Sequence, residues 1–198
     1  MRFGFAFLST AFAALAIAVA TGSFTGLDQW AVDHVMPGGR FGAGEPSAWK
    51  SLIPFGTTDW VSAWSIVSNV VALPASVLIA LVLVAWRSRL LAVLLVAAVA
   101  VEALCKEVLT RPGLDHGAHH VVAFDDSFPS GHALRTVIVA GAFASPWATV
   151  WAVAAIVLIQ LAGWHTPTDI AGGVLLGLLA LLGARALRGR RLARRGPR

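Results

Sequence analysis

The sequence predicts an all-α membrane protein, a bundle of six transmembrane helices with a functional site at its external face. Hydrophobic residues make up 58% of the 198 positions and charged residues only 13%. The mean hydropathy is +0.78, and long apolar runs recur along the chain. A soluble domain of this length does not need so much apolar side chain, whereas each membrane crossing needs about 20 apolar residues in a row. We therefore expect one integral membrane domain over residues 1–198.

The positive charge of the chain gathers at its carboxyl end. The formal net charge is +5, and seven arginines lie between Arg185 and Arg198. A basic tail after an apolar segment is typical of a cytoplasmic anchor that faces anionic lipid, which favours the bilayer over nucleic acid as the partner. Cys105 is the only cysteine, so no disulfide framework is expected. The sequence does not indicate the oligomeric state.

The amino-terminal part of the chain begins with an apolar segment, Phe3–Phe24. We expect an uncleaved first span over residues 1–24, although Ala18-Val19-Ala20 also fits the cleavage site of a signal peptide. Residues 25–59 are mixed in character and predict an external loop, with a short interfacial helix around Leu27–Val35.

Five further apolar segments complete the expected bundle. Pro74 is expected to kink the second span, and the spacing of Gly173 and Gly177 favours close helix packing in the sixth. The segments cover about 61–86, 90–109, 131–145, 147–164 and 170–187.

Cations set the expected orientation, because cytoplasmic loops carry an excess of Lys and Arg. With Arg2, the Arg87–Arg89 turn and the basic tail inside, every acidic residue falls outside or within a span. The polar residues near the opposite helix ends then meet at the extracytoplasmic membrane face. They are Lys106, Arg111, Ser130, Gly131, His132, His165 and Asp169.

The stretch Pro-Ser-Gly-His places groups that suit a phosphate at a predicted helix start. Ser130 is a strong N-cap residue after Pro129, so the first N–H groups of the helix form an anion site. Gly131 permits close approach to the backbone, His132 exchanges a proton near neutral pH, and Arg135 adds a fixed cation. Ordinary helix capping is the alternative interpretation.

A second polar stretch precedes the sixth span. His165 stands just before the helix that Pro167 begins, and Asp169 lies one turn into it. A carboxylate four positions on can orient an imidazole, which is the arrangement of a nucleophilic histidine. A capping carboxylate beside an interfacial histidine is the alternative.

Charged residues also end the third span, where charge at membrane depth is costly. Lys106, Arg111 and Arg135 could together neutralise a phosphoryl group. A structural ion pair between Glu102 and Lys106 is the alternative for that lysine.

The loop that follows the third span is rich in histidine and aspartate, with His116, His119 and His120 close to Asp125 and Asp126. Such spacing can bind a divalent metal. We expect no functional metal here, and favour a lid over the site.

These stretches together resemble the type 2 phosphatidic acid phosphatase family, the lipid phosphate phosphatases. The family carries a lysine followed after six residues by Arg-Pro, then Pro-Ser-Gly-His, then Ser-Arg followed after five residues by His-x-x-x-Asp. The second signature is intact at Pro129–His132, and the end of the third is intact at His165–Asp169. With the order of the signatures and six spans, the resemblance covers most of the chain.

The sequence departs from the family in two signatures. Counted from Lys106, the Arg-Pro pair should fall at 113 and 114, but it begins two residues early at Arg111. Leu158 and Ile159 stand where Ser-Arg is expected. We expect Arg111 and Arg135 to take over the missing phosphate contacts, and a decayed, inactive relative is the alternative.

The resemblance implies hydrolysis of a lipid phosphate or pyrophosphate without a metal or other cofactor. His165, oriented by Asp169, would attack phosphorus and form a phosphohistidine, while His132 would protonate the leaving oxygen and then activate water. Phosphatidic acid, phosphatidylglycerol phosphate and polyprenyl (pyro)phosphate are compatible substrates. The expected phosphate ligands are Lys106, Arg111, Ser130, Gly131 and Arg135.

Two other functions stay open, a lipid-phosphate transporter and a non-catalytic lipid-phosphate binder. A transporter needs a polar path through the membrane, and outside the external cluster the spans offer little beyond Asn69, Gln160 and a few hydroxyls. This scarcity argues against transport.

Overall fold

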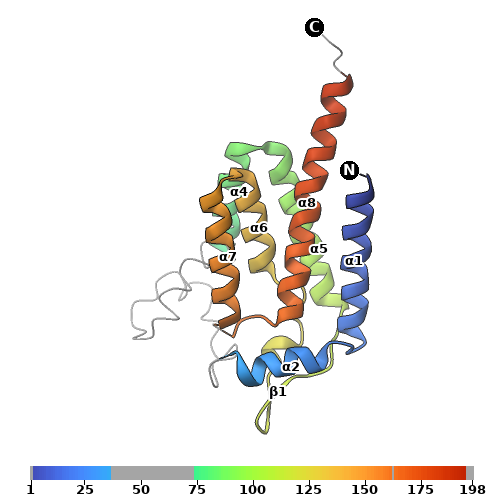
Figure 1. Ribbon diagram of the computed structural model, residues 1–198, viewed down its shortest axis with the longest axis vertical. Coiled ribbons are helices and arrows are strands. Elements are labelled where there is room, and N and C mark those ends of the chain that lie inside the picture. Colours follow the sequence, from blue (N-terminus) through green and yellow to red (C-terminus); the bar gives the residue numbers. More distant parts are fainter. Residues whose placement is uncertain (1, 37–73, 162, 195–198) are drawn as a thin grey trace.

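The computed structural model describes residues 2–36, 74–161 and 163–194, and this part of the chain is mostly helical, as predicted (Figure 1). An upright bundle of helices is crossed at one end by a short helix, and a two-stranded hairpin projects away from the bundle beyond it. The elements are α1 (Arg2–Ala20), α2 (Thr25–His34), α4 (Pro74–Arg87), α5 (Arg89–Val108), β1 (Asp115–His116), β2 (His119–His120), the 3-10 helix η2 (Val122–Phe124), α6 (Gly131–Phe143), α7 (Pro146–Leu161) and α8 (Pro167–Arg194).

The two ends of the bundle differ in their chemistry. The start of α1, the turn between α4 and α5 and the carboxyl end of α8 lie at one end, which carries Arg87, Arg89 and the basic stretch of α8 (Figure 1). At the other end, which we call the site end, α5 finishes and α6 and α8 begin, and α2 lies across them. This places the predicted polar residues at one end and the predicted cytoplasmic cations at the other.

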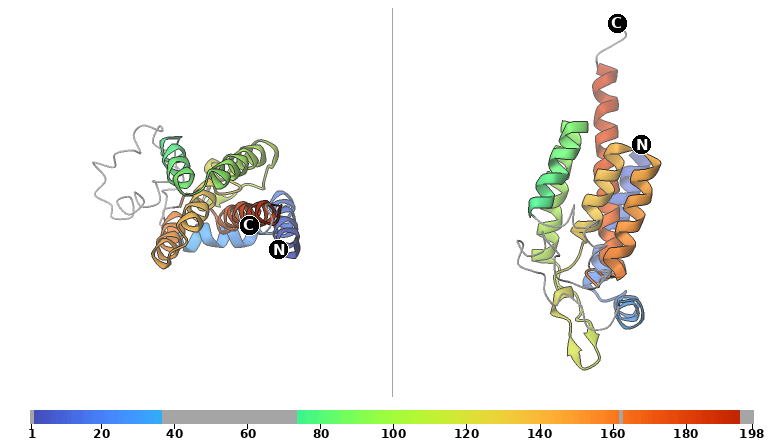
Figure 2. Two further views of the ribbon diagram at one scale, coloured as in Figure 1. Left: turned by 90° about the horizontal axis from the view of Figure 1, so that it is seen from above. Right: turned by 90° about the vertical axis from the view of Figure 1, so that its left-hand side faces the viewer.

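Helix α8 packs against α1, α5 and α6 (Figure 2). Glycine makes the contact with α6 possible. A Cβ atom on Gly173 would lie 2.2 Å from the carbonyl oxygen of Ser130, and one on Gly177 would lie 2.9 Å from Val137. The predicted close packing at these glycines is confirmed, and it brings the first turns of α6 and α8 together.

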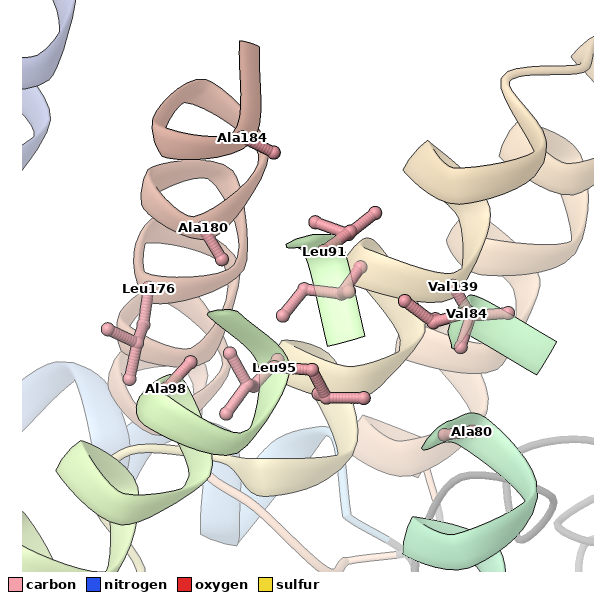
Figure 3. Close-up of a cluster of buried hydrophobic side chains, with 11 residues drawn as sticks. Ala80, Val84, Leu91, Leu95, Ala98, Val139, Leu176, Ala180 and Ala184 are labelled. Carbon is pink, nitrogen blue, oxygen red and sulfur yellow. The ribbon is translucent and has the colours of Figure 1, made fainter. Parts of the chain in front are cut away.

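The apolar core fills the space between α4, α5, α6 and α8 (Figure 3). Leu95 and Ile138 are fully buried in it, and small residues of α8 such as Ala180 let the helices approach. A smaller core under the site end joins Val32 of α2 to Leu114 and Phe124 of the loop after α5. The crossing helix is thus packed against the bundle and the hairpin loop.

In the described part of the chain, only some of the predicted spans correspond to helices long enough to cross a membrane. Among the described residues, only α1 and α8 hold windows both long and apolar enough to cross a membrane, at Phe3–Ala20 and Pro167–Gly189. Helices α6 and α7 are apolar but have 13 and 16 residues, short of the roughly 30 Å hydrocarbon core at 1.5 Å per residue. The six-span bundle therefore stays a prediction.

Helix boundaries otherwise follow the sequence signals. The interfacial helix expected at 27–35 is α2, and Ser130 caps α6 by accepting a hydrogen bond of 3.3 Å from the N–H of Ala133. Pro146 and Pro167 are the first residues of α7 and α8. The rest of the predicted external loop (37–59), the first part of the second span (61–73) and the last tail residues (195–198) lie outside the described residues.

Candidate active site

Two hydrogen-bonded helix starts hold the site together. The backbone N–H of Ser130, at the cap of α6, donates to the carbonyl oxygen of Asp169 in the first turn of α8 at 2.9 Å. His132 follows in the first turn of α6, and His165 lies in the short turn between α7 and α8. The Pro-Ser-Gly-His and His-x-x-x-Asp stretches, which are 33 residues apart, therefore meet as the sequence predicts.

The two histidines face each other directly. Nδ1 of His132 lies 3.1 Å from Nε2 of His165, and the two rings meet edge to face at 65°. Trp164 packs against the His132 ring at 5.2 Å between centroids. His165 is only 7% exposed, and Nε2 of His132 is buried with no hydrogen-bond partner among the described residues. The pair is thus a proton donor and acceptor shielded from bulk water.

Asp169 stands behind His165 and is held rigidly. Its carboxylate is fully buried and accepts hydrogen bonds from the Ser127 hydroxyl at 2.6 Å and from the N–H of Thr166 at 2.9 Å. The distance from Oδ2 to Nδ1 of His165 is 3.7 Å. This is within the range of an ion pair but longer than a hydrogen bond. Asp169 therefore lies beside His165, as predicted for an orienting carboxylate. The distance between its Oδ2 and Nδ1 of His165 must shorten before a hydrogen bond can fix the tautomer of that ring.

Arg111 belongs to a different cluster from the one the sequence suggests. Its guanidinium, 4% exposed, donates to Asp169 at 3.1 Å, to the Thr166 hydroxyl at 3.1 Å and to Asp28 of α2 at 2.5 Å. One cation is therefore shared by two buried carboxylates. Its expected contact with a phosphoryl group stays a prediction, because the structure assigns its described bonds to carboxylates and a hydroxyl.

Lys106 and Arg135 share a carboxylate of their own. Glu102, 6% exposed, lies 3.2 Å from Nζ of Lys106 and 3.2 Å from the guanidinium of Arg135. The ion pair considered as the alternative for Lys106 is thus present, and the anionic partner of Arg135 is Glu102. The three predicted cations do not form one cluster: Arg111 lies on the α2 side, and the other two surround Glu102.

Four site residues were missed by the sequence analysis: Asp28, Ser127, Thr166 and Thr168. The carboxylate of Asp28 is fully buried and accepts from both the N–H and the hydroxyl of Thr168. A signal for Asp28 does exist, since it shares the buried face of α2 with Ala31 and Val32. An acid at that helical spacing from apolar residues indicates a buried partner. Ser127 has no comparable local signal.

The histidine-rich loop forms the hairpin of β1 and β2 beyond the site. His120 lies 3.0 Å from Asp125 and 3.5 Å from Asp115. The hydrogen bond that the His120 ring donates to Asp125 is the main cause that raises the pKa of the exposed His120 above its ordinary value near 6.5. Over the described residues, no group of three or more His, Cys, Asp or Glu side chains is arranged to hold a metal ion.

The arrangement can perform acid–base and nucleophilic chemistry. It combines an imidazole backed by a buried carboxylate, a second imidazole within hydrogen-bond reach, and cations held nearby. Comparison with protein-family models, with curated proteins and with solved structures found no match to this chain.

Proposed function

We propose that this protein is a metal-independent membrane phosphatase of the type 2 phosphatidic acid phosphatase kind, which hydrolyses a phosphomonoester or pyrophosphate of a lipid through a phosphohistidine at His165. The observation that carries the proposal is the pair of imidazoles 3.1 Å apart with Asp169 behind one of them. Such a triad of nucleophile, orienting carboxylate and acid–base partner is what phosphoryl transfer through histidine requires.

In the proposed first step, Nε2 of His165 attacks phosphorus. Asp169 accepts a hydrogen bond from Nδ1–H of His165 once their contact shortens; the proton stays on Nδ1, so the lone pair is on Nε2, the atom that faces His132. The N–P bond forms as the P–O bond to the lipid alcohol breaks, and His132 gives its proton to the departing oxygen. In the second step, His132 takes a proton from water, the water oxygen binds phosphorus, and the N–P bond breaks to release phosphate.

This mechanism requires the two rings to separate. A nucleophile stands about 3–3.5 Å from the atom it attacks, and the acid needs a further hydrogen bond of about 2.8 Å to the leaving oxygen. A phosphoryl group in line therefore does not fit between nitrogens 3.1 Å apart. Rotation of the His132 ring against Trp164 would open the space.

The outer faces of the helices support a membrane location. Large apolar side chains point outward along α5 and α7, among them Val96, Leu104, Trp147 and Val153, which are all more than half exposed. Exposed apolar surface along whole helices is costly in water and favourable in lipid. Together with the two helices that can span a bilayer, this favours a multi-pass protein. The arginines at the opposite end of the bundle favour a site end outside the cytoplasm.

An apolar groove supports a lipid substrate. It has a volume of about 990 Å³ and runs between α1, α5 and α8, from Phe5 and Leu187 to Leu176 and Val101. Val101, at one end of the groove, precedes Glu102 of the charged cluster in α5, so this end of the groove is the one nearer to the cluster along that helix. A hydrocarbon tail in this groove would leave the phosphorylated head group at the site end.

The test is phosphate release by the purified protein in detergent, from a panel of lipid phosphates and pyrophosphates, with a chelator present. We expect release by the wild type and loss of release in His165→Ala and His132→Ala. His119→Ala, which changes an exposed histidine of β2, is the matched control and should retain activity. Equal release by His165→Ala and the wild type would overturn the proposal.

A second candidate is a catalytically inactive binder of lipid phosphates, and the pairing of the cations favours it. Lys106, Arg111 and Arg135 all contact carboxylates, whereas a phosphatase needs cations for the transition state. Binding of a lipid phosphate without its hydrolysis by the wild type would support this candidate. Transport by the same fold has no comparable observation in its favour.

A further inference from the structure

We propose that Glu102 is an internal competitor of the phosphoryl group, a carboxylate that occupies the anion position between Lys106, Arg135 and the start of α6 and thereby restricts which charge state of phosphate the site accepts. The inference rests on the proposed function, because it concerns the same anion site. It assigns to Glu102 a role in substrate specificity, and nothing in the family resemblance predicts a carboxylate at this position.

The position of Glu102 is defined by two ion pairs and by its closeness to Gly131. Its two carboxylate oxygens lie 3.2 Å from Lys106 and 3.2 Å from Arg135. A Cβ atom on Gly131 would lie only 2.0 Å from Oε1 of Glu102. The space that glycine leaves free at the helix start is therefore filled by this carboxylate, which is 6% exposed. Glu102 thus lies where the sequence analysis places the phosphate.

The charges at the site end are already balanced by the protein itself. Lys106 and Arg135 flank Glu102, while Arg111 lies between Asp28 and Asp169, so the two clusters contain three cations and three carboxylates. A phosphomonoester above neutral pH carries close to two negative charges. Such a dianion meets like-charge repulsion from Glu102, and this repulsion is smaller for a monoanion.

Two ligands that the protein cannot hydrolyse test this inference. Methylphosphonate is largely a dianion well above neutral pH, whereas its monomethyl ester is a monoanion that is larger by one methyl group. Their affinities are measured by calorimetry on the full-length protein in detergent at moderate salt. The variants are the wild type, Glu102→Gln and Glu107→Gln, a control that removes an exposed charge from the same helix.

We expect Glu102→Gln to bind methylphosphonate about tenfold more tightly or better than the wild type, because one like charge beside the anion is removed. The affinity for the monoester should rise by a clearly smaller factor. Glu107→Gln should bind both ligands as the wild type does, because Glu107 is exposed and solvent screens its charge. Unchanged, weaker or undetectable binding of methylphosphonate by Glu102→Gln overturns the inference. An equal increase in affinity for both ligands overturns it as well. Glu102 would then only hold Lys106 and Arg135 in place.

A second variant covers the case in which Glu102→Gln does not fold, since Arg135 is buried beside it. Glu102→Asp keeps the charge but withdraws the carboxylate from Gly131, so it should bind methylphosphonate more tightly by a smaller factor, and unchanged or weaker binding contradicts the inference. These measurements involve no turnover. Failure of the proposed function is detected separately, as phosphate release that does not depend on His165.

Discussion

His132 and His165 lie within hydrogen-bond distance, 3.1 Å between Nδ1 of one and Nε2 of the other. They come from the first turn of α6 and from the turn before α8, and the hydrogen bond from Ser130 to Asp169 fixes these segments relative to each other. One imidazole has a buried carboxylate behind it and the other has none among the described contacts. The two rings are therefore chemically distinct, and substitutions at them should have different consequences.

Replacement of His132 by alanine should allow a covalent intermediate to accumulate. With a lipid pyrophosphate, whose leaving group needs little protonation, His165 can still attack, but hydrolysis of the phosphohistidine loses its base and should slow by roughly 10²–10⁴-fold. Intact mass spectrometry should find one acid-labile phosphoryl group on His132→Ala and none on His165→Ala. A phosphoryl group that persists in His165→Ala would place the nucleophile elsewhere.

Asp28→Asn should destabilise the protein, because it removes a buried negative charge beside Arg111. Its carboxylate is one of two that compensate the buried Arg111 and it also accepts from Thr168, and breaking such a buried pair costs about 3–5 kcal/mol. Denaturant unfolding in detergent measures the change. Asp33→Asn on the exposed side of α2 is the control, with an expected change within about 0.5 kcal/mol. Equal stabilities of the two variants would contradict the assignment.

Gly173→Ala should separate the first turns of α6 and α8. The added Cβ would meet the carbonyl oxygen of Ser130 at 2.2 Å, and such overpacking typically costs about 1–3 kcal/mol. We expect a lower melting temperature and loss of phosphate release. Gly183→Ala in the same helix meets Leu94 at an ordinary 3.6 Å, and should keep the melting temperature of the wild type. Normal activity in Gly173→Ala would show that the helix starts need not touch.

The contact between His120 and Asp125 should depend on pH. Because the hydrogen bond that His120 donates to Asp125 raises the pKa of His120 above 6.5, the stability that the contact adds to the loop is fully present below the ordinary histidine pKa. It is lost as the pH rises through the raised pKa. NMR titration of the His120 ring should show the raised pKa in the wild type and a value nearer 6.5 in Asp125→Asn. A raised pKa in both proteins would point to another cause.

The proposed orientation can be tested with single cysteines in a Cys105→Ser background. Ala118→Cys at the hairpin should react with a membrane-impermeant maleimide in intact cells, whereas Gly189→Cys at the opposite end of α8 should react only after permeabilisation. Both positions are exposed in the structure. The reverse pattern would invert the topology and place the site in the cytoplasm.

The sequence was sufficient to predict the helix starts and their meeting. Ser130 and Pro167 carry local signals for a cap and a first helical turn, and Gly173 and Gly177 indicate the face on which two helices touch. These features depend on neighbours a few residues apart, which a sequence displays directly.

The partners of the charged residues could not be predicted in the same way. Arg111 contacts Asp28 from 83 residues away, and Arg135 contacts Glu102 from 33 residues away. A buried cation indicates that an anion lies near it, but spacing alone does not tell a carboxylate of the chain from a phosphate of a ligand. For this reason the sequence predicted one cluster of cations and the structure contains two.

The helix α2 reaches the surroundings of His165 through Asp28, which accepts hydrogen bonds from Thr168 and pairs with Arg111, and the guanidinium of Arg111 in turn binds Asp169. With the bilayer surface at α2, as proposed, a tilt or lift of this helix by the surrounding head groups pulls on that guanidinium and so on the aspartate behind His165. Lipid composition and curvature would then act on the catalytic geometry from the water side, without any rearrangement of the bundle core.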